Sequence, residues 1–207
     1  MRAERVTPVA SLVEFFKDAV AEAMLQQKVS AADQTSYYID NLLTLFARSE
    51  ALFEPAPEGG PQLRPLAAML ADAVAASDLQ ERNFALQRLG DVSLFVAGFF
   101  GEGLASKPVD VDYYVHMGGS AYGSLSANVR NTVRGRAFGE VFAELAVKFQ
   151  DFVDVLAEVR DHARSSRDAD VLRLYELWLR TGSTRAARLL RNAGVEPNQL
   201  LDADFKH

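Results

Sequence analysis

The sequence LGDVSLFVAGFFGEGL, at residues 89–104, is the most apolar run of the chain and decides the fold. Bulky apolar side chains lie at Val92, Phe95 and Phe99, and Leu94 falls on the opposite side of a helix that contains them. A helix that is apolar on all sides belongs in a protein core. We therefore predict that this segment is a central helix and that the rest of the chain packs around it.

Small residues recur along the same segment. Ser93, Ala97 and Gly101 follow one another at intervals of four, and Gly98 and Gly103 widen the stripe. Residues four apart share one face of a helix, whereas glycine inside a helix costs about 1 kcal/mol relative to alanine. The pattern indicates close packing against another backbone, which we favour, or room for a ligand.

Composition restricts the classes of function. The chain has 207 residues, 49% of them hydrophobic, which is enough for one domain with a real core. It contains no cysteine, which excludes disulfides and thiolate zinc sites and agrees with a cytoplasmic location. The formal net charge of −6 argues against general nucleic-acid binding. The central apolar run of about ten residues is shorter than the roughly 20 that a membrane span needs. We predict no membrane association and no cofactor.

Apolar residues at intervals of three and four, together with helix caps, predict an all-α, single-domain helical bundle of about eight helices. No segment has the alternating, β-branched character of a sheet. Prolines and paired glycines make residues 54–65 a surface loop within one domain at 1–194, and residues 195–207 a flexible tail. The expected helices cover about residues 8–28, 33–52, 66–76, 78–106, 110–131, 138–159, 171–182 and 184–194.

A short connection joins the central helix to the next one. Asp110 can cap this next helix. Because the connection is short, the two helices form a central antiparallel helix hairpin. If the turn lies near Lys107, residues equally distant from it lie level, which places Asp91 beside Tyr122. A buried carboxylate is costly unless it is hydrogen-bonded. We therefore expect Asp91 to bind Tyr122 or an arginine such as Arg130, with catalysis as the alternative.

The same register suggests a metal site. It brings Glu102 opposite Asp112 and close to His116. Two carboxylates and an imidazole can bind a divalent metal in a hydrolase or oxygenase. Against this, Asp112 and His116 are four apart and also make an ordinary helix pair. The sequence also lacks the Glu-x-x-His motifs of di-iron bundles.

A small-molecule pocket between the two hairpin helices is a further alternative, because glycines on their facing sides leave room for a ligand. The candidate lining residues are Asp91, Gly98, Gly101, Tyr113, Gly119, Tyr122 and Gly123.

The cleanest period of the chain lies in residues 138–159. Its heptad spacing is that of a helix bundle or short coiled coil and predicts one continuous helix. Val141 and Val155 flank this seam and exceed what one neighbouring helix covers, so we expect a homodimer. The alternative is that they are covered by other helices of the same chain. The seam residues are Phe138, Phe142, Leu145, Phe149, Phe152, Leu156 and Val159.

Arginines outnumber acidic residues in the segment 160–191 and offer a surface for a protein partner. The alternative is a solvated face paired with acidic neighbours. The seam and the arginines together favour a non-enzymatic helical scaffold or protein-interaction module. The small-molecule binder and the metal-dependent enzyme remain the other hypotheses.

Two segments carry a resemblance to other proteins. LGDVSLFVAGFF at 89–100 and VDYYVHMGGSAY at 111–122 resemble sequences of an uncharacterised group of bacterial soluble all-helical proteins. The resemblance implies helices and a bacterial source. It implies no activity, so no functional residue is carried over.

Overall fold

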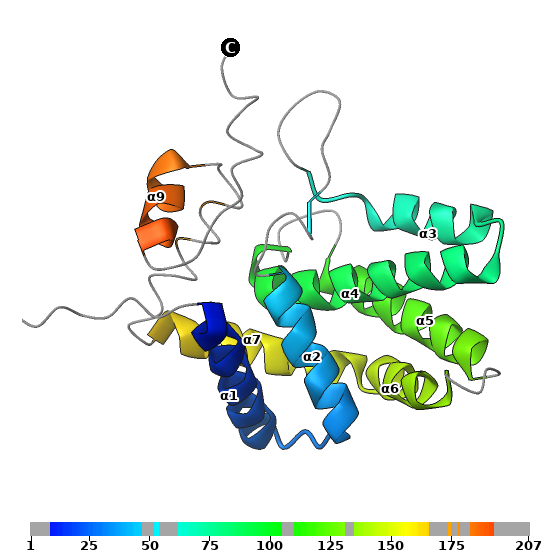
Figure 1. Cartoon of the computed structure of the whole chain (residues 1–207), viewed down its shortest axis with the longest axis horizontal. Helices are drawn as coiled ribbons and strands as arrows, with labels where there is room; N and C mark the ends of the chain where they lie inside the picture. The colour runs from blue at the N-terminus through cyan, green and yellow to red at the C-terminus, as the bar shows by residue number, and fades with distance from the viewer. Residues whose placement is uncertain are drawn as a thin grey trace, which may run out of the picture.

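A computed structural model of the protein describes residues 9–46, 52–53, 62–104, 110–130, 135–165, 174, 178 and 183–192. These residues form eight helices and no β-strand, which confirms the all-α prediction (Figure 1). The helices are α1 Val9–Gln27, α2 Asp33–Phe46, α3 Leu66–Ala75, α4 Leu79–Leu104, α5 Val111–Val129, α6 Arg136–Val147, α7 Phe149–Ser165 and α9 Thr184–Asn192.

The central hairpin is confirmed. Residues 89–99 of α4 are all buried, and α4 contacts α2, α3, α5 and α7. The Asp78 carboxylate accepts a hydrogen bond from the Glu81 N–H at 2.8 Å and begins α4. The Asp110 carboxylate accepts one from the Tyr113 N–H at 3.1 Å and begins α5, as the sequence predicts.

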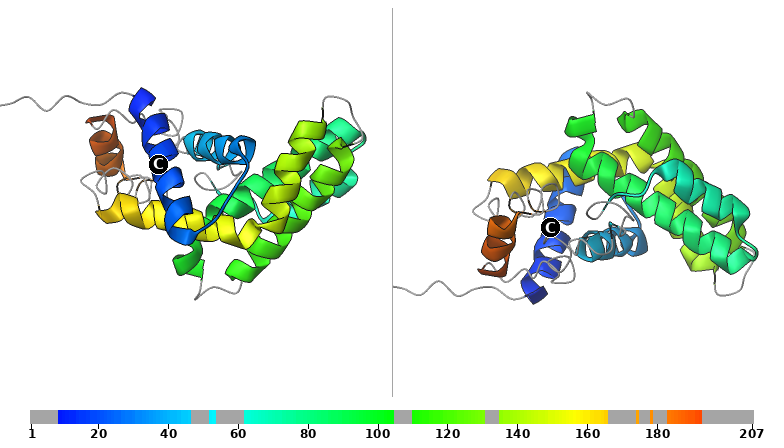
Figure 2. Two further views of the ribbon diagram at one scale, coloured as in Figure 1. Left: turned by 90° about the horizontal axis from the view of Figure 1, so that it is seen from below. Right: turned by 90° about the horizontal axis from the view of Figure 1, so that it is seen from above.

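The prediction of one continuous helix over residues 138–159 is wrong. α6 ends at Val147 and α7 begins at Phe149, because Lys148 leaves the helical conformation with φ −101° and ψ 26°. Figure 2 shows that the two helices point in different directions. The bend lets α6 pack on α2 and α5 while α7 packs on α1 and α4, which one straight helix could not do.

Burial along the seam also differs from the prediction at one end. Phe138 is 59% exposed, whereas the six seam residues that follow it are buried. Val141 and Val155 are buried too, so their predicted exposure is wrong, because they are covered by helices of the same chain. The homodimer stays a prediction, and these two valines no longer support it.

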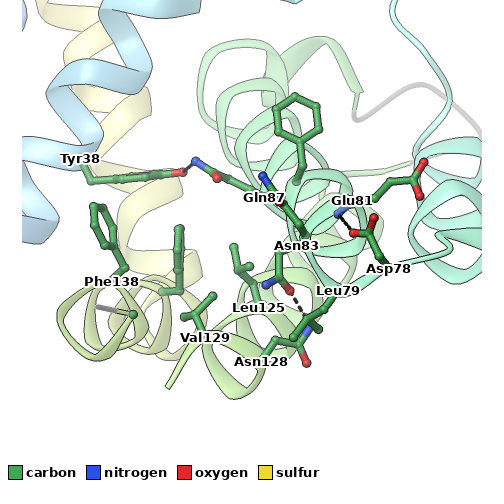
Figure 3. Close-up of a pocket in the computed structure, with 14 residues that line it drawn as sticks. Tyr38, Asp78, Leu79, Glu81, Asn83, Gln87, Leu125, Asn128, Val129 and Phe138 are labelled. Carbon is green, nitrogen blue, oxygen red and sulfur yellow. Dashed lines mark hydrogen bonds between the residues drawn. The ribbon is translucent and has the colours of Figure 1, made fainter. Parts of the chain in front are cut away.

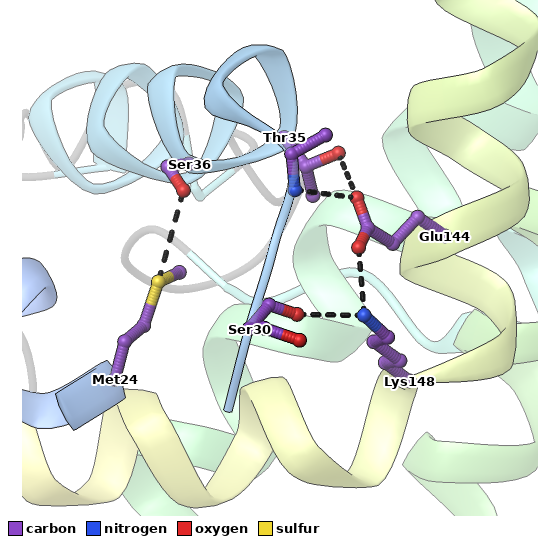
Figure 4. A network of polar contacts seen from close by, with 7 residues as sticks. Met24, Ser30, Thr35, Ser36, Glu144 and Lys148 are labelled. Carbon is purple, nitrogen blue, oxygen red and sulfur yellow. Dashed lines mark hydrogen bonds and ion pairs between the residues drawn. The ribbon is translucent and has the colours of Figure 1, made fainter. Parts of the chain in front are cut away.

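Glu144 of α6 ties the bend to the start of α2 (Figure 4). Its Oε2 accepts hydrogen bonds from the Thr35 hydroxyl at 2.6 Å and the Ala32 N–H at 3.1 Å. Its Oε1 accepts one from the Lys148 ammonium at 2.8 Å, and that ammonium also donates to the Ser30 carbonyl at 2.6 Å. Burial alone would raise the pKa of Glu144, but the hydrogen bonds from Lys148, Thr35 and Ala32 outweigh it and lower the pKa.

α2 is shorter than predicted. It ends at Phe46, so the buried Leu52 lies outside it, and Leu45 is 51% exposed. Tyr38 turns toward the core and Tyr37 turns away from it.

Trp178 and the buried face of α9 form a second, smaller apolar cluster beside the main core. No helix in the described ranges has the length and apolar character of a membrane span. Most of the predicted loop at 54–65, most of the predicted helix at 171–182 and the tail at 195–207 lie outside the described residues.

Candidate functional site

A pocket of about 1130 Å³ lies where α2, α4, α5 and α6 meet (Figure 3). We call it the α4–α6 pocket. The first two turns of α4 form one wall, and the end of α5 and the start of α6 form the other. Its large apolar side chains are Leu79, Phe84, Leu125, Val129, Phe138 and Phe142.

Three of these side chains are exposed. Phe84 is 74% exposed, Phe138 59% and Leu79 53%. A single exposed apolar residue is ordinary in a protein surface, but a group of them around one hollow marks a binding site. The α4–α6 pocket is therefore the candidate functional site.

Two acidic residues stand at one end of the pocket, and the described lining contains no lysine or arginine. The Glu81 carboxylate accepts hydrogen bonds from both the N–H and the hydroxyl of Ser77, each at 3.0 Å. The Asp78 carboxylate is held by the Glu81 N–H. This reciprocal capping fixes both carboxylates at the start of α4.

A buried carboxylate lies behind the other end of the pocket. The hydroxyls of Tyr38 and Tyr122 donate to Oδ1 of Asp91 at 2.6 and 2.7 Å, and the Gln87 amide donates to the Tyr38 hydroxyl at 3.0 Å. The predicted bond between Asp91 and Tyr122 is confirmed. The contact from Tyr38 was not predicted, because it depends on how α2 crosses α4.

Burial raises the pKa of Asp91 to about 6, although the two tyrosine hydrogen bonds and the charge of Arg88 act in the opposite direction. Burial and the neighbouring carboxylate raise the pKa of Tyr38 and of Tyr122. Tyr38 and Gln87 line the pocket, whereas Asp91 does not. The network therefore supports the pocket wall from behind.

The described residues contain no group of three or more His, Asp or Glu that could hold a metal ion, so Glu102, Asp112 and His116 form no such cluster. Glu102 instead accepts a 2.7 Å hydrogen bond from Arg160 of α7. Asp112 and His116 are exposed on α5.

Of the glycines predicted to line a ligand pocket, Gly98 is closely packed, whereas a Cβ atom at Gly101, Gly119 or Gly123 would make only ordinary van der Waals contacts. A Cβ atom at Gly98 would lie 2.4 Å from Leu156 Cβ, and one at Gly101 would lie 3.4 Å from Val111 Cγ2. Cβ atoms at Gly119 and Gly123 would lie 3.6 and 3.9 Å from atoms of Ala146.

Tyr113 is half-buried at the start of α5, where its ring meets that of Tyr114 at 6.0 Å. None of the seven predicted ligand residues lines the α4–α6 pocket. Two of them contact residues that do: Asp91 accepts the hydrogen bond from Tyr38, and the Tyr122 ring stacks on that of Phe142.

Where its side chains are described, the arginine-rich segment has one buried arginine, two exposed ones and the half-buried Arg191. Arg160 is buried and pairs with Glu102 at 2.7 Å and with Asp161 at 2.8 Å. Arg185 and Arg188 are exposed on α9. Arg164, Arg167, Arg173 and Arg180 lie outside the described side chains.

Phe84 and Phe138 were not predicted as site residues, although Phe84 leaves a signal in the sequence. It stands two residues before the buried Leu86, and two residues correspond to about 200° around a helix. A large apolar residue opposite the buried face of its helix indicates a surface contact. Phe138 leaves no such signal, because it fits the heptad period of a buried seam.

Comparisons of the sequence with protein-family models, with curated proteins and with solved structures find no match. The resemblance to bacterial helical proteins therefore stays a prediction. The α4–α6 pocket is the feature from which a function can be inferred.

Proposed function

We propose that the protein is a non-enzymatic interaction module that binds a polypeptide segment in the α4–α6 pocket. The observation that carries the proposal is the exposure of Phe84, Phe138 and Leu79 around one hollow. Large aromatic side chains in the middle of a contact surface supply most of the binding energy in protein interfaces.

The size and openness of the pocket favour a polypeptide over a small molecule. Small-molecule pockets measure about 300–1,000 Å³ and enclose most of the ligand. This pocket is larger, at about 1130 Å³, and two of its phenylalanines are more than half exposed. A ligand there contacts an open surface with an apolar centre and a polar edge.

The buried Asp91 favours a structural role over catalysis. Its Oδ1 accepts hydrogen bonds from the hydroxyls of Tyr38 and Tyr122, and the Asp91 side chain does not line the pocket. We therefore assign Asp91 to holding Tyr38 and Tyr122 in place. The cysteine-free composition is compatible with a cytoplasmic location for this binding.

Selection of displayed random peptides on the purified protein tests the proposal. We expect selected peptides to bind with micromolar affinity and to lose about tenfold or more when Phe84 and Phe138 are both changed to serine. The control variant changes Leu25 and Val147 to serine, because these two residues are equally apolar, 80% and 85% exposed, and outside the pocket. Equal binding to the Phe84→Ser, Phe138→Ser variant would overturn the proposal.

A further inference from the structure

Carboxamide side chains are concentrated in the α4–α6 pocket. Asn83 and Gln87 project from α4, and Asn128 projects from the end of α5 (Figure 3). Gln80 of α4 lines the pocket as well. A carboxamide carries a carbonyl acceptor and an N–H donor side by side. A peptide group presents the same two functions, so carboxamides are suited to pair with the backbone of a ligand.

Asn83 and Asn128 form a fixed pair across the two walls. The Asn128 Nδ2 donates to Asn83 Oδ1 at 2.8 Å, and both residues are half-buried. Within the described residues, Asn83 Nδ2 and Asn128 Oδ1 make no hydrogen bond with another protein group. The pair therefore offers the amide NH2 group of Asn83 and the carbonyl oxygen of Asn128 to a ligand.

Gln87 is held in a similar way. Its Nε2 donates to the Tyr38 hydroxyl, which in turn donates to the buried Asp91. This series of bonds leaves the Gln87 carbonyl oxygen as a further acceptor in the lining of the pocket. Side chains that are fixed before binding lose less conformational entropy when a ligand arrives.

We infer that the α4–α6 pocket binds a peptide segment in an extended conformation. The backbone carbonyl and N–H groups of the peptide pair with Asn83 and Asn128, and one of its large apolar side chains lies against Phe84 and Phe138. A helical segment fits less well, because its peptide groups are already hydrogen-bonded to one another. The described lining has acidic residues and no lysine or arginine, which also disfavours a phosphate-bearing ligand. The inference rests on the proposed function of the pocket.

N-methylation of a bound peptide tests the inference. The probe is the tightest peptide from the selection described above, methylated at one backbone nitrogen at a time. We expect one methylation to weaken binding about tenfold, because it removes the N–H that donates to Asn128. That loss should shrink to less than about twofold in Asn128→Leu, where the acceptor is already absent. Asn41→Leu, which changes an exposed amide on α2 outside the pocket, is the matched control.

The outcomes separate the inference from the proposed function. If binding depends on Phe84 and Phe138 but methylation costs the same in Asn128→Leu as in the wild type, the function stands and the inference is overturned. Nuclear Overhauser contacts that show a helical bound peptide would overturn it as well. The inference would also be overturned if adenosine or uridine bound more tightly than any peptide and caused chemical-shift changes centred on Asn128. If no peptide depends on Phe84 and Phe138, the proposed function itself fails. Thermal unfolding of each variant confirms that it is folded before binding is compared.

Discussion

The Tyr122 hydroxyl of α5 donates a 2.7 Å hydrogen bond to Oδ1 of Asp91 in α4, and the bond crosses the hairpin between residues 31 apart in the sequence. Tyr38 of α2 donates to the same oxygen. One buried carboxylate thus joins three helices. Its protonation state is therefore linked to the stability of the fold.

The first prediction concerns the pH dependence of that stability. The pKa of Asp91 is about 6 in the folded protein, above its ordinary value of 3.8. Between these values the folded state binds more protons than the unfolded state, so the free energy of unfolding falls as pH rises. The free energy of unfolding falls by roughly 3 kcal/mol in total, because the pKa of Asp91 differs by about two between the folded and unfolded states. Asp91→Asn removes this titration.

Urea unfolding from pH 4 to 7 measures the effect. We expect the stability of Asp91→Asn to rise relative to the wild type by most of this amount over that interval, and to change little above pH 7. Asp151→Asn, an exposed carboxylate on α7, is the control and should show no such rise. A constant difference between Asp91→Asn and the wild type at every pH would contradict the prediction.

The second prediction compares two glycines of α4. A Cβ atom at Gly98 would meet Leu156 of α7 at 2.4 Å, whereas nothing lies within 4 Å of a Cβ atom at Gly103. We expect Gly98→Ala to destabilise the protein by about 1–3 kcal/mol through overpacking. Gly103→Ala should stabilise it by up to about 1 kcal/mol through helix propensity. Chemical denaturation compares the two, and equal effects would show that α4 and α7 are not in close contact.

The hairpin could be predicted from the sequence because its determinants are local. A short connection and the cap at Asp110 set the register, and that register was enough to pair Asp91 with Tyr122. The contact from Tyr38 was not predictable in this way. It depends on the position of α2, which long-range packing decides.

The bend at Lys148 could not be predicted either, because the heptad period continues through it. The bend is stabilised by contacts with the start of α2. The Ala32 N–H donates to the Glu144 carboxylate and the Lys148 ammonium donates to the Ser30 carbonyl, and these residues are distant in sequence. Once α6 turns away from the line of α7, Phe138 leaves the core. The site therefore arises from a departure from the regular pattern.

The third prediction tests the contact of Glu144 with α2. Glu144→Ala leaves the buried Thr35 hydroxyl without its acceptor and should cost about 1–3 kcal/mol. Glu144→Gln keeps an acceptor oxygen and should cost less. Glu140→Ala, on an exposed position of the same helix, should stay within about 0.5 kcal/mol of the wild type. Equal stability of Glu144→Ala and Glu140→Ala would remove the role assigned to this contact.

The fourth prediction uses two phenylalanines that hold the same heptad position, 14 residues apart. Phe152 is fully buried, and Phe138 is 59% exposed in the α4–α6 pocket. Phe152→Ala should cost about 3–5 kcal/mol of unfolding free energy, because it leaves a cavity in the core. Phe138→Ala should change it by less than about 0.5 kcal/mol. Urea unfolding at two protein concentrations tests whether Phe138 is free for a partner. A large, concentration-dependent loss of stability for Phe138→Ala would mean that a second copy of the protein covers this residue. The pocket would then be a dimer interface and not a site for a separate partner.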